Sequence, residues 1–177
     1  MFTRLLPLLS VTALLASCGS VSKVNAPNAG PLTTKTFQRV LVKDFTHTVA
    51  DDDGTTPVAA RKFSDKIAVA IREAKPGANV SRTGKEDAST LVIAGEVTRY
   101  MEGNAALRFL VGMGAGSSYF DANVRLIDGA DGKQLGLIRV DKNSWGLGGG
   151  IAASQTVDHF MGLGAKTTAT EVAKIVR

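Results

Sequence analysis

Residues 119–141 read YFDANVRLIDGADGKQLGLIRVD and carry the clearest strand pattern in the chain. The first half alternates apolar and polar residues, which is the period of a β-strand with one buried face. The apolar side consists of Phe120, Ala122, Val124 and Leu126. Two Asp-Gly pairs within residues 128–132 favour a tight turn, and residues 133–141 resume with Leu135, Leu137 and Ile138. We therefore predict an antiparallel hairpin within a sheet.

The flanking chain adds two strands and two helices. Gln38–Phe45 and Leu91–Tyr100 are rich in β-branched residues and are typical of strands. After Pro57, the residues Ala60, Phe63, Ile67, Ala70, Ile71 and Ala74 share one helical face. Residues 157–176 form a second amphipathic pattern, with Ser154 or Thr156 as N-cap. We expect an α+β domain in which two amphipathic helices cover one face of a largely antiparallel sheet of about four strands.

The N-terminal residues predict an export signal. Residues 5–16 are largely apolar, but a bilayer-spanning helix needs about 20 such residues. Leu15-Ala16-Ser17-Cys18 follows and resembles the bacterial lipobox. We interpret residues 1–17 as a lipoprotein signal peptide. Cys18, the only cysteine, then carries diacylglycerol and an N-acyl chain; the alternative is an ordinary secretory peptide with an incidental cysteine.

Residues 18–36 are small and polar and contain two prolines, so we interpret them as a lipidated flexible tether before a single domain at 37–177. Neither Gly19 nor Ser20 is the aspartate that favours inner-membrane retention in proteobacterial lipoproteins. We therefore expect the protein to be anchored in the outer membrane and to face the periplasm.

The composition excludes several functions. Lys and Arg number 21 against 16 Asp and Glu, a surplus too small and too dispersed for a nucleic-acid partner. One cysteine excludes an internal disulfide, and two histidines do not complete an ordinary zinc site. The acidic run 51–53 does not match a calcium loop, because position 62 is Lys62. We expect no metal and no cofactor, and the sequence identifies no small-molecule substrate.

Two glycine-rich segments, 103–118 and 143–153, interrupt the globular pattern. They match neither the Walker nor the dinucleotide-binding motif, so we do not interpret them as phosphate loops. Their large apolar residues are candidate contacts for a partner or for lipid; the alternative is that they cover one end of the sheet. These residues are Leu107, Phe109, Leu110, Val111, Met113 and Trp145.

Four motifs carry a family resemblance: residues 92–100, 103–108, 112–121 and 141–146. Together they resemble a bacterial family of small lipoproteins defined by a domain of unknown function, over roughly residues 38–175. More distantly, the order of strands and glycine-rich hairpin resembles the periplasmic part of the curli secretion-channel lipoprotein. In that family the glycine-rich region leads into membrane-crossing hairpins that assemble into a barrel. Here only residues 104–121 are long enough for one short hairpin.

No catalytic motif is present in the sequence. There is no Gly-x-Ser-x-Gly elbow, and Asp158 and His159 are adjacent on a helix, so they do not face each other. Glu96 and Arg99 have opposite parity in their strand, so they need not share a face. We predict a non-catalytic interaction or assembly module whose partners are the membrane, through the anchor, and another envelope protein or a second copy. The alternative is a subunit of an oligomeric secretion channel.

Overall fold

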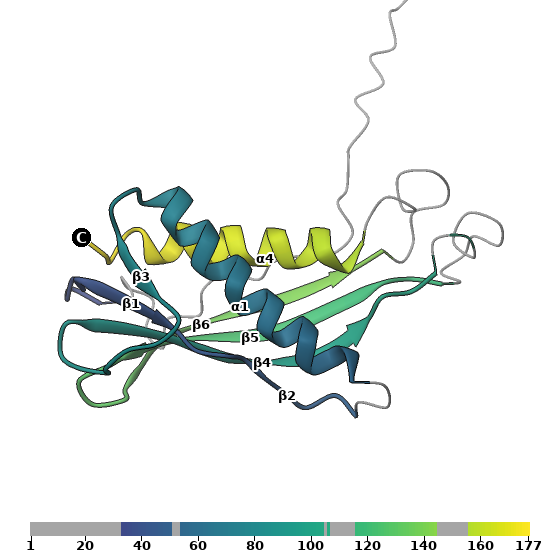
Figure 1. Cartoon of the computed structure of the whole chain (residues 1–177), viewed down its shortest axis with the longest axis horizontal. Coiled ribbons are helices and arrows are strands. Elements are labelled where there is room, and N and C mark those ends of the chain that lie inside the picture. Colours follow the sequence, from purple (N-terminus) through teal and green to yellow (C-terminus); the bar gives the residue numbers. More distant parts are fainter. Residues whose placement is uncertain (1–32, 51–53, 105, 107–115, 145–155) are drawn as a thin grey trace, which may run out of the picture.

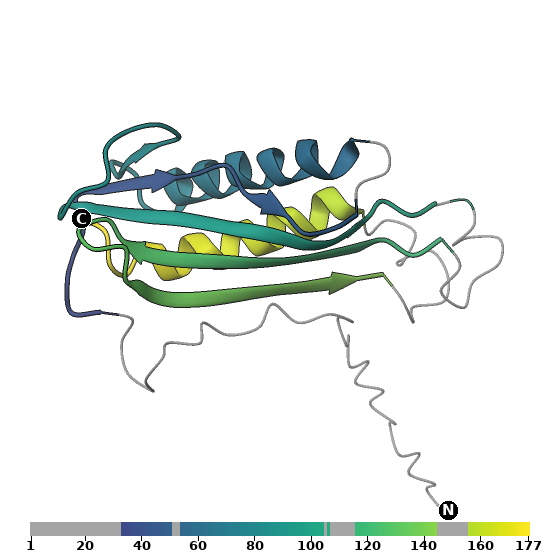
Figure 2. The same ribbon diagram turned by 90° about the horizontal axis from the view of Figure 1, so that it is seen from below.

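The computed structural model describes residues 33–50, 54–104, 106, 116–144 and 156–177. In chain order the elements are β1 (Arg39–Val42), β2 (Thr46–His47), α1 (Thr55–Ala74), β3 (Asn79–Ser81), β4 (Thr90–Met101), β5 (Tyr119–Asp128), β6 (Gln134–Asn143) and α4 (Val157–Val172). Both helices lie on the same face of one sheet (Figures 1 and 2). The predicted α+β class is therefore confirmed, as is the β5–β6 hairpin.

The sheet is larger than predicted, with six strands instead of about four. Its order is β3-β1-β4-β5-β6, with β2 paired to β4. The pairings of β1 with β3 and β4, and of β2 with β4, are parallel. Since parallel neighbours need a crossover, α1 connects β1 and β2 to β3. The two extra strands are two and three residues long, too short for an alternating pattern to show.

The two ends of the sheet differ in what they connect to. At one end Met101 lies opposite Tyr119, and Tyr119 lies opposite Asn143, so both glycine-rich segments leave there. We call this the glycine-rich end. At the other end Phe37 bridges Val176, and Lys35 Nζ lies 2.7 Å from the carboxylate of Asp128. We call this the tether end, because the N-terminal chain joins the domain there.

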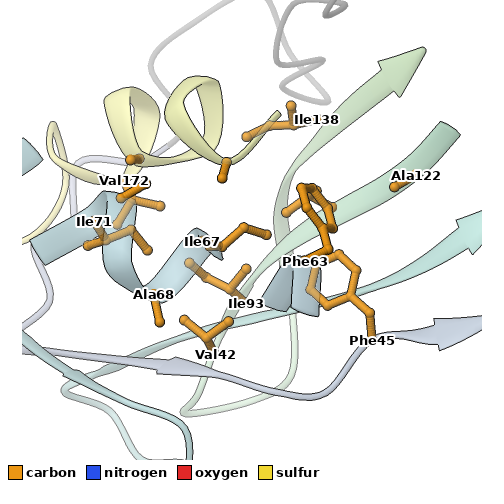
Figure 3. Packing of buried hydrophobic residues seen from close by; sticks show 14 of the residues in the cluster. Val42, Phe45, Phe63, Ile67, Ala68, Ile71, Ile93, Ala122, Ile138 and Val172 are labelled. Atoms are coloured by element: carbon orange, nitrogen blue, oxygen red, sulfur yellow. The ribbon is translucent and has the colours of Figure 1, made fainter. Parts of the chain in front are cut away.

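The core lies between the helices and the inner face of the sheet. Phe63 of α1 packs edge-to-face on Phe45 (Figure 3), with ring centroids 5.3 Å apart, and also on Phe120, with ring centroids 4.9 Å apart. Such aromatic pairs contribute about 0.5–1.5 kcal/mol each beyond their burial. The predicted apolar face of α1 is buried except for Ala74, which lies at the exposed end of the helix.

Two details position the elements that lead to the glycine-rich end. Thr156 is the N-cap of α4, where its side chain accepts a hydrogen bond from the His159 N–H at 3.2 Å. In β4, a Cβ at Gly95 would lie 2.2 Å from the Asn123 carbonyl oxygen and 2.5 Å from the Phe45 ring. Only glycine permits that approach. Among the described residues, no helix combines the length and apolarity that a bilayer span requires.

Candidate functional site

A buried pair of serines joins the bases of the two glycine-rich segments. The Ser118 N–H donates to Ser144 Oγ at 2.8 Å, and the Ser144 N–H donates to the Ser118 carbonyl at 3.1 Å. Ser118 Oγ also donates to the Glu102 carbonyl. Ser118 is fully buried and Ser144 is 3% exposed. Since buried polar groups are costly when unpaired, these bonds fix where each segment leaves the sheet.

The first glycine-rich segment starts and ends at one narrow neck. The Asn104 N–H donates to the Gly116 carbonyl at 2.9 Å. Gly103 has a φ of +70°, and a Cβ there would lie 2.3 Å from the Gly116 carbonyl oxygen. Any side chain would clash with the returning backbone, so this position requires glycine.

The predicted contact residues follow Asn104 and Ser144 in the sequence. Leu107, Phe109, Leu110, Val111 and Met113, together with Trp145 and the predicted lipidation site Cys18, lie outside the described residues. The acidic run 51–53 also lies outside them. The structure therefore fixes where the two segments attach, and the contact role of these side chains stays a prediction.

A β-bulge gathers charged residues on the outer face of the sheet, opposite the helices. The register shifts between Val97 and Arg99, so that Glu96 lies opposite Asn123 and Arg99 lies opposite Asp121. Both Glu96 and Arg99 consequently point to the outer face, although their spacing gives them opposite parity. The bulge inserts one residue and reverses the alternation. Alternation alone did not reveal this cluster.

Within this cluster, two aspartates lie opposite each other, and Arg99 lies opposite one of them in the neighbouring strand. Asp121 and Asp141 are directly opposite in the β5–β6 ladder. Burial raises the pKa of Asp121 and the charge of Asp141 adds to this, while Arg99 acts in the opposite direction. Asp121 Oδ1 is buried without a hydrogen-bond partner among the described residues. Arg99 also stacks on Tyr119, with its Cζ 3.7 Å from the ring centroid.

A shallow cleft of about 250 Å³ opens on the helix side of the same end. It lies between the first turns of α1 and α4, and Tyr100 and Glu102 line its sheet side. Asp158 binds Lys62 at 2.8 Å and Lys66 at 3.1 Å, which ties α4 to α1. The hydrogen bonds from Lys62 and then Lys66 lower the pKa of Asp158. In the part of the chain that the structure describes, no group of three His, Cys, Asp or Glu side chains is placed to hold a metal ion.

These features define a class of protein. It is an α+β domain with both helices on one face of the sheet and charged residues on the other, and at one end hydrogen bonds join the bases of two glycine-rich segments. The chain belongs to the family of the domain of unknown function DUF4410, whose model matches residues 33–148. The match ends shortly after β6 and leaves out α4. The expected membership in a family defined by a domain of unknown function is thereby confirmed, and that its members are lipoproteins stays a prediction. Among curated proteins, none matches the sequence significantly.

Solved structures show the same fold over almost the whole length. A PelC dodecamer from Paraburkholderia phytofirmans aligns with a TM-score of 0.60 and 13% identity, covering 90% of this chain and 99% of the PelC chain. A single-substitution variant of that PelC dodecamer aligns with a TM-score of 0.50 and 14% identity, covering 85% and 97%. At this level of identity the likeness establishes the fold.

Proposed function

We propose that this protein is a non-catalytic module of the cell envelope, lipid-anchored through Cys18 in the outer membrane, that faces the periplasm and assembles with copies of itself. The observation that carries this proposal is the full-length similarity of the domain to the subunit of a dodecamer. The lipobox-like Leu15–Cys18 supports the anchor. A lipoprotein with three acyl chains exceeds the two that stable anchoring needs.

The position of the tether supports contact with protein at the glycine-rich end. The N-terminal chain joins the domain at Lys35 and Phe37, at the tether end. The twelve residues of β4 extend about 40 Å from there toward the glycine-rich end. A coil of the tether's composition and length has a typical span of about 23 Å. An anchor at the tether end allows the glycine-rich end to lie away from the bilayer, and this supports an envelope protein or a second copy over lipid as its contact.

Two measurements on the full-length protein test the anchor. Mass spectrometry of the mature protein should find Cys18 as an acylated first residue. Cys18→Ser should abolish acylation and leave the protein uncleaved or soluble. Ser20→Ala, which spares the cysteine, should be acylated and retained in the membrane like the wild type. An unacylated terminus or a retained leader in the wild type, or a cleaved Cys18→Ser variant that stays in the membrane, would refute the anchor.

The mass of the detergent-extracted protein tests assembly. We expect an assembly of several copies at micromolar concentration, and a strictly monomeric protein would refute self-assembly.

A second candidate is a channel subunit, which the dodecameric state of PelC favours because a channel needs many copies. It requires a closed assembly that conducts ions in a planar bilayer. An assembly that forms without conductance would leave the module as proposed and exclude the channel.

A further inference from the structure

Among the described elements, the helix layer and the sheet each have one face that no other helix or strand covers (Figure 2). On the solvent side of the helix layer, α1 and α4 flank a groove of about 360 Å³. Its floor includes Val69, Ala70 and Ala165, and Val69 is half exposed. A Cβ at Gly162, which also lines the groove, would meet nothing within 4 Å. An apolar groove with charged residues along its rim is typical of a contact site.

The rim of this groove is basic toward the glycine-rich end and acidic toward the tether end. Lys62 and Lys66, which we call the lysine pair, share the carboxylate of Asp158, so these three residues carry one net positive charge. Glu73 lies on the same rim two turns after Lys66, toward the tether end, and is exposed. Among the described residues, no ion pair engages Glu73. Lys166 lies between these two parts of the rim.

The outer face of the sheet has the opposite order of charge. At the glycine-rich end, Asp121 lies between Asp141 and Arg99, so on this face the row has two acids and one cation. We call it the acidic row. In the next row toward the tether end, one acid and one cation lie on either side of Asn123. In the row after that, Arg125 is exposed and lies opposite apolar residues on both neighbouring strands, so this row is positive.

Contacts through the core show that these charges lie at matching heights along the strands. Phe63, next to the lysine pair in α1, packs on Phe120, next to the acidic row in β5. Glu73 follows Phe63 by ten residues, about 15 Å along α1, which is inclined to the strands (Figure 1). Arg125 follows Phe120 by five residues, about 17 Å along β5 in the same direction. The lysine pair and the acidic row therefore share one height, and Glu73 and Arg125 share a second.

We propose that the groove between α1 and α4 receives the outer sheet face of a second copy that has the same orientation. Copies anchored in one bilayer are related by rotation about an axis along the strands, and this rotation keeps every residue at its height. The lysine pair of one copy then meets the acidic row of the next, and Glu73 meets Arg125. A contact between two like faces would set lysine against lysine at the same height.

The contact of unlike faces agrees with an assembly of several copies. It is heterologous, so each copy offers its sheet to one neighbour and its groove to another, and the contact repeats. All tethers then lie at one end. Each sheet in the assembly has helices on both faces, which is a common layer architecture. This inference rests on the proposed self-assembly and names the two surfaces that carry it.

Co-expression of two cysteine variants tests which faces meet. Glu73→Cys and Arg125→Cys are each made in the full-length protein, whose only other cysteine, Cys18, is taken up by the proposed anchor. In detergent, a short thiol-specific crosslinker should join the two variants when they are expressed together, and it should join neither variant to itself. The wild type keeps only Cys18 and is the control for crosslinking through the N-terminus.

Charge reversal tests the meeting of Glu73 with Arg125 independently. Glu73→Arg sets two cations against each other and Arg125→Glu sets two acids, so each variant should need about tenfold more protein to reach half-assembly. The exchange variant E73R/R125E restores opposite charges and should assemble within about threefold of the wild type. Lys133→Glu is the matched control, because Lys133 is exposed in the turn between β5 and β6, outside both faces. Both tested residues are exposed, so the urea midpoints should stay near that of the wild type.

The outcomes separate this inference from the function that it deepens. Crosslinks in the co-expressed pair alone, together with recovery of the exchange variant, support the contact of unlike faces. That contact is refuted, while self-assembly stands, if the wild type assembles and any of three results is found: no crosslink in the pair, crosslinking of a single variant to itself, or no recovery on charge exchange. If the wild type is monomeric, both the contact and the self-assembly fail.

Discussion

Replacing each of two glycines of α4 by alanine should shift stability in opposite directions. Gly162 and Gly164 are two residues apart in the same helix. A Cβ at Gly164 would lie 3.0 and 3.1 Å from the two methyl carbons of Val140 and 3.3 Å from the Phe63 ring. A Cβ at Gly162 would meet nothing within 4 Å. Carbon atoms pack favourably at about 3.5–4.0 Å, so only the first substitution crowds the core.

The magnitudes follow from two opposing effects. Alanine in a helix interior gains about 1 kcal/mol over glycine, and this gain applies to both positions. Overpacking a core costs about 1–3 kcal/mol, and this cost applies only at Gly164. We expect Gly162→Ala to raise the free energy of unfolding by about 1 kcal/mol. Gly164→Ala should lower it by about 0–2 kcal/mol, because α4 is held between Val140 and Phe63.

Urea denaturation of both variants, followed by circular dichroism in one buffer, measures the difference directly. The same Gly→Ala exchange in one helix cancels effects on the unfolded chain. A Gly164→Ala variant as stable as Gly162→Ala, or more stable, would show that α4 does not depend on this close approach to β6.

Three further predictions concern the glycine-rich end. Ser144→Ala should lower the free energy of unfolding by about 1–3 kcal/mol, because it leaves the buried Ser118 N–H without its acceptor; an unchanged urea midpoint would contradict the serine pairing. Burial raises the pKa of Asp121 above 3.8, so the native state holds a proton on this carboxylate more tightly than the unfolded chain does. The free energy of unfolding should therefore fall as the pH rises from about 4 through the raised pKa. Asp121→Asn should remove this fall, as denaturation midpoints measured between pH 4 and pH 8 would show; an identical pH profile would refute the assignment. A photo-crosslinker at Phe109 in intact envelopes should capture protein; adducts with lipid alone would place the glycine-rich end against the bilayer instead.

The elements with enough length could be predicted from the sequence. The alternation of residues 119–127 repeats often enough to define a buried face, and Phe120, Ala122, Val124 and Leu126 are indeed buried. The same holds for α1, where six apolar residues recur at helical spacing. These patterns are local, because each residue's face depends only on its neighbours in the chain. The lipobox at Cys18 is equally local, and the anchor that it indicates stays a prediction.

The extent of the short strands and the bulge in β4 depend on pairing between segments that are distant in the sequence. The strand predicted at Gln38–Phe45 is β1 alone, since the chain leaves the ladder after Val42 and joins β4 again at Thr46. β2 and β3 are strands only because β4 and β1 lie beside them. The bulge after Val97 adds one residue to β4 and so brings Glu96 and Arg99 to one face of the sheet. The apolar and polar pattern of the strand does not show where such a bulge occurs.

Local patterns in the sequence were therefore enough to predict the class of the fold and the hairpin, and they also indicate the anchor. The contact of Ser118 with Ser144, the pairing of Asp121 with Asp141 and the place of β6 at the edge of the described sheet became visible in the tertiary structure. Each of these features depends on how two strands pair. Periodicity describes one segment at a time, so it does not show which residues of two strands lie opposite each other.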